Sequence, residues 1–241
     1  MLIDVSKEVG IDQITIDLIP SPKIEYMRFI TFRFLRLLGM VEPKRNIERQ
    51  GFYPRGGGQV KVTFFPTKKL RPIRILQRGK VNRIGGSSVA GSLPEHVAER
   101  QAEAAENILS ESGLTGLQIN AENFSTNSRG TSITLWAECE NTILGADATG
   151  AIGKRAESVG MEVATGLLSS VNSGKALDKF MSDQIIPFAA LAKGRSEFTV
   201  EDFTDHVVTN MAVTESILGV SFEVDRDERR ISVEGMGYSM E

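Results

Sequence analysis

The sequence predicts an α+β fold, and two observations carry that prediction. Apolar residues recur at every second position in some segments and at every third or fourth in others, which are the periods of strands and of helices. Strands follow one another directly in places and alternate with helices elsewhere, an order typical of α+β proteins rather than of a doubly wound parallel sheet. A chain of 241 residues, 41% of them hydrophobic, is long enough for one large or two modest domains.

The N-terminal part predicts a strand, a helix and a second strand. Residues 11–18 alternate apolar and polar side chains, as a half-buried strand does. Ser21 and Pro22 mark a helix start, because serine caps the first N–H groups and proline fits the first helical position. The helix stops at Gly39, and its apolar face holds Met27, Ile30, Phe34, Leu37 and Leu38. Residues 60–64 predict a strand that pairs with the segment before a glycine-rich turn.

The pattern restarts near Arg71. A strand at 73–76 leads into a glycine- and serine-rich stretch that predicts a loop. Ser92 and Glu95 have the spacing of a capping box, which opens an Ala-rich helix that ends near Ser112. The block continues with strands at 117–121, 131–138 and 142–146, and with a helix that has Val159, Val163, Leu167 and Val171 on one face.

The C-terminal part returns to a mixed order of elements. It predicts a helix over 176–186 disturbed by Pro187, a strand at 197–200, a helix over 209–218, and strands at 220–224 and 230–234. We therefore expect an inserted α/β domain at 72–171 and a main domain formed by residues 1–71 and 172–241.

Charge is unevenly distributed along a chain whose net charge is −3. No Asp or Glu stands between Glu48 and Glu95, a stretch that contains ten Lys and Arg residues. Such a segment forms a basic surface that binds phosphate groups, or it places Lys and Arg on the solvated face of ordinary strands. The sequence leaves both interpretations open.

The single cysteine and the lack of long apolar runs indicate the compartment. Cys139 has no second cysteine to pair with, which fits a reducing environment, and its apolar neighbours indicate a buried structural thiol rather than a nucleophile. No apolar run approaches the roughly 20 residues that span a membrane. We expect a cytoplasmic protein without membrane partners.

Of the two histidines, His206 is the candidate for chemistry. His96 falls in the first turn of a predicted helix, where a solvated histidine needs no further role. His206 directly precedes the helix predicted from Thr209, and the free N–H groups at a helix start attract phosphate. Most single histidines are structural, so the spacing alone leaves that alternative open.

Two further segments could contact a nucleotide. Phe180, Asp183 and Gln184 share one helix face, so the ring could stack on a base while the polar groups bond to it. A core phenylalanine with two solvated neighbours is the alternative. The run Gly-Phe-Tyr-Pro-Arg-Gly-Gly-Gly-Gln at 51–59 suits a tight strand turn or a phosphate cradle, and it lacks the Lys-Ser/Thr ending of a P-loop.

In this order, these segments resemble the RNA 3'-terminal phosphate cyclase family. The run at 51–59 is the most distinctive stretch of a resemblance that extends from about residue 15 to the C-terminus. Other similar stretches lie at 94–100, 153–160, 182–188 and 206–210. The resemblance implies a main domain of repeated βαβαββ units, of the type shared with enolpyruvyl transferases, and a small inserted thioredoxin-like α/β domain.

The resemblance also implies an activity. In this family a histidine attacks ATP to form histidyl-AMP, AMP passes to an RNA 3'-phosphate, and the neighbouring 2'-hydroxyl closes a 2',3'-cyclic phosphate with loss of AMP. His206 matches the nucleophile, and a divalent metal (Mg or Mn) offsets the developing charge. The chain is thus expected to be a nucleotidyl-transferring enzyme of the ligase class whose partner is RNA with a 3'-phosphate end.

The same resemblance assigns nucleotide contacts. Phe180 stands where the family has a tyrosine stacked on adenine, and Asp183 and Gln184 match the polar pair that follows. Pro22 matches the proline on the other adenine face, and Asn210 ends the motif that begins with the nucleophile. These residues are the expected ATP-binding set.

One departure qualifies the expected activity. Family members carry a further N-terminal part with the metal-binding glutamate and the arginines that hold the RNA phosphate. We expect this chain to lack that part, to retain the nucleophile and to have little cyclase activity alone. The alternative functions are a catalytically inactive cyclase-like protein that binds RNA or assists ribosome assembly, against which His206 argues, and a generic RNA-binding module that uses the basic stretch.

Overall fold

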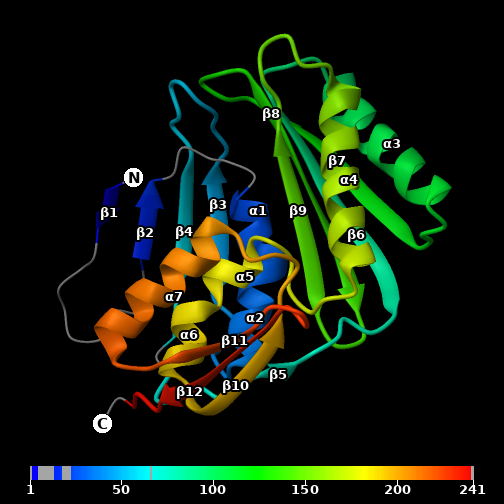
Figure 1. Ribbon diagram of the computed structural model, residues 1–241. Coiled ribbons are helices and arrows are strands. Elements are labelled where there is room, and N and C mark those ends of the chain that lie inside the picture. The colour runs from blue at the N-terminus through cyan, green and yellow to red at the C-terminus, as the bar shows by residue number, and fades with distance from the viewer. Residues whose placement is uncertain (1, 5–13, 18–22, 66, 240–241) are drawn as a thin grey trace.

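The computed structural model describes residues 2–4, 14–17, 23–65 and 67–239. It confirms the α+β class, with three four-stranded sheets and helices packed between and outside them (Figure 1). The helical segments are α1 (Lys23–Tyr26), a π-helical turn (Met27–Thr31), α2 (Phe32–Leu37), α3 (His96–Glu111), α4 (Ala156–Ser173), α5 (Met181–Gln184), α6 (Ile186–Leu191) and α7 (Asp205–Leu218). The strands are β1 (Leu2–Asp4), β2 (Ile14–Asp17), β3 (Lys44–Arg49), β4 (Gln59–Thr63), β5 (Arg74–Ile75), β6 (Val81–Gly91), β7 (Leu117–Phe124), β8 (Gly130–Cys139), β9 (Ile143–Thr149), β10 (Lys193–Thr199), β11 (Phe222–Asp225) and β12 (Arg230–Met236).

The first sheet is antiparallel, with the strand order β1-β2-β4-β3. β3 and β4 form the hairpin that the sequence predicts around the glycine-rich turn. Ile30, Phe34 and Leu38 are buried on the helix beside it, as expected, whereas Leu37 is 47% exposed. Ile30, Phe34 and Leu38 are four residues apart and share one helix face, whereas Leu37 lies about 100° around the helix from Leu38.

A second sheet has the order β7-β6-β8-β9, with β6 parallel to β7 and antiparallel to β8. Helices α3 and α4 lie together over one face of this sheet, on the side away from α1 (Figure 1). The predicted apolar face of α4 is buried there in full: Val159, Val163, Leu167 and Val171. This block therefore has the small α/β character expected of the middle of the chain.

The central strand β6 corrects one prediction. The sequence predicts a loop in this glycine- and serine-rich segment, and the structure has an eleven-residue strand. A β-carbon at Gly85 would overlap the indole of Trp136. One at Gly86 would overlap Leu135 and Ile119. Large neighbours occupy the space of the missing side chains, so tertiary packing overrides the low strand propensity of glycine.

The capping box predicted at Ser92 is also wrong. The Ser92 backbone is left-handed (φ 49°), and its hydroxyl donates to the Thr126 carbonyl and accepts from the Thr126 N–H, both at 2.9 Å. Helix α3 begins at His96, and Glu95 before it makes no side-chain cap. The Ser92 hydroxyl, which the sequence spacing predicts as a helix cap, therefore bonds instead to Thr126 in the connection between β7 and β8.

The third sheet has the order β11-β12-β10-β5, and α6 packs between β12 and α7. The helix predicted over 176–186 is wrong in part, because Leu177 instead bridges Val200 and only the single turn α5 follows. Pro187 opens α6 rather than disturbing a longer helix, since its missing N–H costs nothing in a first turn.

Two hydrophobic cores hold these parts together. One consists of buried residues between Ile84 and Val171, and the other combines buried residues of 24–75 and 176–233 with Trp136 and Ile143. These last two side chains reach across from β8 and β9, so the blocks are packed against each other. The predicted domain boundaries after residues 71 and 171 stay predictions. Within the described ranges, no helix is both long and apolar enough to cross a membrane.

Candidate nucleotide-binding site

His206 is exposed in the first turn of α7. The helix begins at Asp205, and the Thr204 hydroxyl caps it by accepting a hydrogen bond from the Val207 N–H at 3.2 Å. The sequence predicts a start near Thr209, and that prediction is wrong by four residues because Thr204 supplies the cap. His206 therefore stands within the N-terminal turn, where unpaired backbone N–H groups favour an anion.

The expected adenine-binding residues lie on or beside the short helix α5. Phe180 directly precedes it and is half-buried, with its ring edge-to-face against Tyr26 at a centroid distance of 5.6 Å. The Lys179 ammonium lies 4.9 Å from the centre of the Phe180 ring. Gln184 accepts a hydrogen bond from the Thr31 hydroxyl at 2.8 Å. The ring and the amide are thus held by side chains of the π-helical turn and α1.

Asn210 connects the two halves of the site. Its side-chain Nδ2 donates to the backbone carbonyl of Asp183 at 3.1 Å. His206 precedes Asn210 by one helical turn, on the same side of α7, where side chains are about 6 Å apart. The structure therefore brings the histidine motif next to α5, although the two are separated in sequence. Pro22 lies outside the described residues.

Asp178 is the residue of this region that the sequence does not single out. It is fully buried, and three donors converge on its Oδ1: the Tyr26 hydroxyl at 2.6 Å and the N–H groups of Phe180 and Met181 at 2.9 Å. Oδ2 accepts a hydrogen bond from the Gly145 N–H of β9 at 2.8 Å. One carboxyl group thus joins α1, β9 and the turn that carries Phe180.

Burial decides the protonation behaviour of this carboxyl group. Removal from water raises the pKa of Asp178 to about 6, against the opposing effect of its four hydrogen-bond donors. The pKa of Tyr26 is raised well above its ordinary value, first by burial and then by the Asp178 charge, so Tyr26 stays a neutral donor. A sequence signal existed, because an aspartate shortly before a helix is a typical N-terminal cap, and the Asp178 side chain accepts the N–H groups two and three residues further on.

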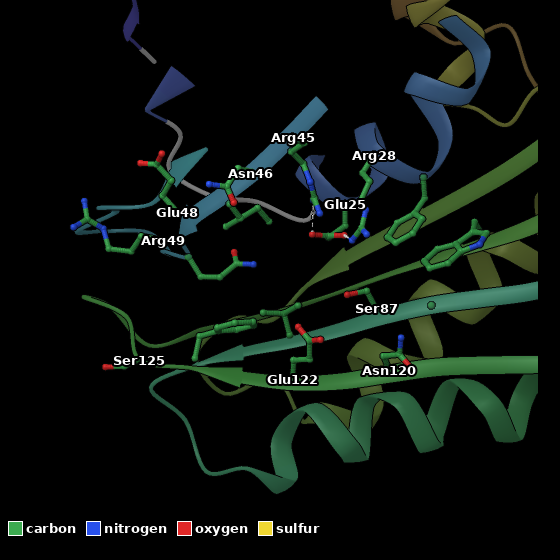
Figure 2. Close-up of a pocket in the computed structure, with 17 residues that line it drawn as sticks. Glu25, Arg28, Arg45, Asn46, Glu48, Arg49, Ser87, Asn120, Glu122 and Ser125 are labelled. Atoms are coloured by element: carbon green, nitrogen blue, oxygen red, sulfur yellow. Dashed lines mark hydrogen bonds and ion pairs between the residues drawn. The ribbon is translucent and has the colours of Figure 1, made fainter. Parts of the chain in front are cut away.

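A separate groove lies between the hairpin and the second sheet. It encloses about 500 Å³, and Figure 2 shows Arg28, Glu25 and Arg45 facing Ser87, Asn120 and Glu122 across it. Its charged lining residues balance: Glu25, Glu48 and Glu122 against Arg28, Arg45 and Arg49. Arg45 is moreover paired with Glu25 at 2.8 Å. This groove does not contain the expected nucleotide-binding residues, and its neutral lining gives no general attraction for a phosphate backbone.

The glycine-rich run at 51–59 forms a tight turn that packs on the second sheet. Phe52 is 5% exposed, and β-carbons at Gly91 or Gly130 would overlap its ring. The Arg55 N–H donates to the Ser128 hydroxyl at 3.0 Å, across the same contact. Of the two open interpretations, the strand turn therefore describes this run, and its buried Phe52 ring packs the hairpin against β6 and β8.

Several cations of the basic stretch are paired with acceptors elsewhere in the fold. Arg74 pairs with Glu197 at 3.0 Å, and Arg83 pairs with Glu138 at 2.6 Å. Arg78 donates to the Val171 carbonyl at 2.7 Å, near the end of α4. Carboxylate and carbonyl oxygens from distant parts of the chain thus pair with these arginines. The interpretation of Lys and Arg on the solvated face of ordinary strands holds for them, and the alternative of a generic RNA-binding module loses support.

The remaining candidates carry no site. Cys139 is half-buried, and burial raises the pKa of its thiol to about 11, which suppresses the reactive thiolate. His96 is exposed at the start of α3. In the part of the chain that the structure describes, no group of three or more His, Cys, Asp or Glu residues could hold a metal ion.

An exposed histidine beside an aromatic ring, a carboxylate and an amide is an arrangement suited to a nucleotide-binding protein. Comparison with known families agrees: a sequence model described as RNA 3'-terminal phosphate cyclase matches residues 8–224. The chain belongs to the RNA 3'-terminal phosphate cyclase family.

Three relatives, each named RNA 3'-terminal phosphate cyclase, show the extent of the similarity. The protein of Caldivirga maquilingensis is 41% identical over 244 residues, which cover 96% of this chain and 68% of the relative. That of Methanothermobacter thermautotrophicus is 43% identical, with 87% and 60% covered, and that of Thermococcus kodakarensis is 40% identical, with 85% and 59% covered. The chain therefore spans about three fifths to two thirds of the length of these relatives.

Proposed function

We propose that this chain carries the histidine nucleophile and the adenine-binding residues of an ATP-dependent RNA 3'-phosphate cyclase. Family membership supports the reaction class. The observation that carries the proposal is the hydrogen bond from Asn210 to the Asp183 carbonyl, because it joins the helix of His206 to the turn of Phe180. The cyclase-like protein without catalysis is the weaker candidate, since an exposed histidine stands at the nucleophile position.

The chemistry proceeds in three balanced steps. A neutral imidazole nitrogen of His206 attacks the α-phosphorus of ATP, a P–N bond forms, and pyrophosphate leaves. The 3'-phosphate of RNA then attacks the same phosphorus, which returns the free imidazole and leaves an RNA–AMP anhydride. Finally the ribose 2'-hydroxyl attacks the terminal phosphate, the 2',3'-cyclic phosphate forms, and AMP leaves with the bridging oxygen. Only RNA supplies that hydroxyl.

The residues of this chain bind and orient ATP in this scheme. Phe180 stacks on one adenine face, Pro22 covers the other, and Asp183 and Gln184 supply polar contacts. Phenylalanine retains the stacking area of a tyrosine and lacks its hydroxyl. The N-terminal turn of α7 places backbone N–H groups beside His206, where they offset negative charge that builds up on phosphate.

The family reaction uses a divalent cation, Mg or Mn, which would neutralise the phosphate charge. The described residues offer no matching group of ligands, so no step is assigned to a metal held by this part of the chain. Asp183 is the carboxylate included in the proposed site, and its role here is to contact the nucleoside.

Covalent labelling tests the proposal. Incubation of the full chain with ATP labelled at the α-phosphate and magnesium is expected to give an acid-labile adduct of the mass of AMP on His206. The matched control is His96→Asn, because both histidines are exposed in the first turn of a helix. His206→Asn is expected to abolish the adduct, by at least about a thousandfold in rate, while His96→Asn retains it.

The opposite pattern would contradict the proposal. An adduct that persists in His206→Asn, or no adduct in the wild-type chain at saturating ATP, removes the assigned nucleophile. A second measurement, conversion of an RNA 3'-phosphate to the cyclic phosphate, then distinguishes a cyclase from a protein that only binds RNA.

A further inference from the structure

Asp178 occupies the junction between three parts of the fold. It follows α4, precedes α5, and contacts α1 through Tyr26 and β9 through Gly145. The hydrogen bond to Tyr26 spans 152 positions in sequence and the one to Gly145 spans 33. The structure thus concentrates long-range hydrogen bonds on a single buried oxygen pair.

We infer that Asp178 is a positioning residue that fixes Phe180 in the orientation needed to stack on adenine, and that it ties this orientation to strand β9. The inference rests on the proposed function. Asp178 reaches the ring in two ways: it accepts the Phe180 N–H directly, and it holds the hydroxyl of Tyr26, whose ring packs edge-to-face on Phe180.

A carboxylate is the side chain that this junction requires. Donors approach both oxygens, three at Oδ1 and the Gly145 N–H at Oδ2. An asparagine there keeps one acceptor oxygen and turns its NH₂ group toward a second donor. Asp178→Asn therefore loses either the bonds to α1 and α5 or the bond to β9, and in both cases the connection between Phe180 and β9 is broken.

The neighbouring segment is braced independently, which provides a control. The Thr142 hydroxyl donates to the Ala176 carbonyl at 2.7 Å, two residues before Asp178. Thr142 also belongs to the connection that leads into β9. Thr142→Val removes a buried hydrogen bond of similar kind at the same junction, and it leaves the contacts of Phe180 unchanged.

The test compares the binding of ATP with that of inorganic tripolyphosphate, measured calorimetrically in the same magnesium buffer. Tripolyphosphate reports the phosphate contacts alone, so the ratio of the two dissociation constants reports the adenosine contacts. Phe180→Ala removes the stacking ring and sets the scale for a full loss of stacking. It is expected to weaken the binding of ATP, relative to that of tripolyphosphate, by about tenfold or more. A variant that is merely destabilised weakens both ligands equally.

Asp178→Asn and Tyr26→Phe are each expected to weaken ATP binding about fivefold to tenfold, with tripolyphosphate binding within about twofold of wild type. Thr142→Val is expected to change neither by more than about twofold. Hydrogen exchange at the Phe180 and Met181 amides should accelerate in Tyr26→Phe.

Each result is decisive. If the wild-type chain prefers ATP and both variants keep that preference, the role of Asp178 is overturned while the proposed function stands. If Thr142→Val loses the preference equally, the junction acts through general stability, and the inference is again overturned. If the wild-type chain shows no preference for ATP, the proposed adenine site fails, and the inference that rests on it fails too.

Discussion

The two sides of the proposed site are built in contrasting ways. The α5 side, with Phe180 and Gln184, is fixed by buried partners from α1, the π-helical turn and β9. The α7 side carries His206 in an exposed helical turn, and the side-chain amide of Asn210 links the two sides by its hydrogen bond to the Asp183 carbonyl. The fold therefore holds the proposed base-binding side through buried contacts and presents His206 on its surface.

This difference suits the order of events in nucleotidyl transfer. A preformed base-binding surface lowers the entropy lost when ATP binds, because its side chains are already ordered. In the proposed function the histidine meets two different partners, first ATP and then an RNA phosphate, so an accessible helix start serves that role better than a buried pocket.

The largest expected effect is a pH dependence of stability from Asp178. Its pKa of about 6 in the folded chain exceeds the ordinary value of 3.8, so between these values the folded state binds more protons than the unfolded state. The stability contributed by this group is therefore fully present below about pH 4 and is lost as pH rises through about 6. The full difference is about 3 kcal/mol.

Urea unfolding of the wild type and Asp178→Asn between pH 4 and 7 measures this effect. The wild-type free energy of unfolding should fall relative to the variant by about 3 kcal/mol over that range, because asparagine does not titrate. The Tyr26 hydroxyl faces the carboxyl group and stays protonated throughout, so it adds no slope. Parallel curves for the two proteins would show that Asp178 titrates at its ordinary pKa.

A smaller effect is expected on the exposed side, at the start of α7. Thr204→Ala removes the N-cap hydrogen bond to Val207 and should lower the free energy of unfolding by about 1 kcal/mol. Thr209→Ala is the matched control, since that residue is exposed within the helix and should change stability by less than about 0.5 kcal/mol. Equal costs at the two positions, measured by urea unfolding, would contradict a helix that begins at Asp205.

The structural features that depend on residues close together in the sequence could be predicted from it. The buried face of α4 follows from spacing alone, and the order of the motifs around 51–59, 180–184 and 206–210 is enough to indicate the family. These features depend on neighbours within a few positions, for which helical period and motif spacing are sufficient.

The rest could not be predicted because its causes lie far away in sequence. The glycines of β6 are explained by Trp136 and Leu135 on the next strand, and propensity alone favours a loop. The hydroxyl of Ser92 bonds to Thr126 instead of to its own helix. The role of Asp178 in joining three parts of the fold depends on hydrogen bonds to Tyr26 and Gly145, which are distant in sequence, so the sequence alone does not predict it.

The smallest expected effect concerns the link between the two sides. Asn210→Ala removes the hydrogen bond to the half-buried Asp183 carbonyl and should lower the free energy of unfolding by only about 0.5 kcal/mol. Because α7 then loses this hold on α5, the rate of His206 adenylation at saturating ATP should fall about threefold, with ATP affinity within about twofold of wild type.

This last variant separates two roles for one residue. The resemblance to the family assigns Asn210 to the nucleotide, whereas its observed bond assigns it to the alignment of two helices. A loss of ATP affinity without a change in the saturated rate would favour the nucleotide contact. A loss of rate with affinity retained favours alignment, and it would mean that the exposed nucleophile depends on the rigid side for its placement, which makes the contrast between the two sides a functional one.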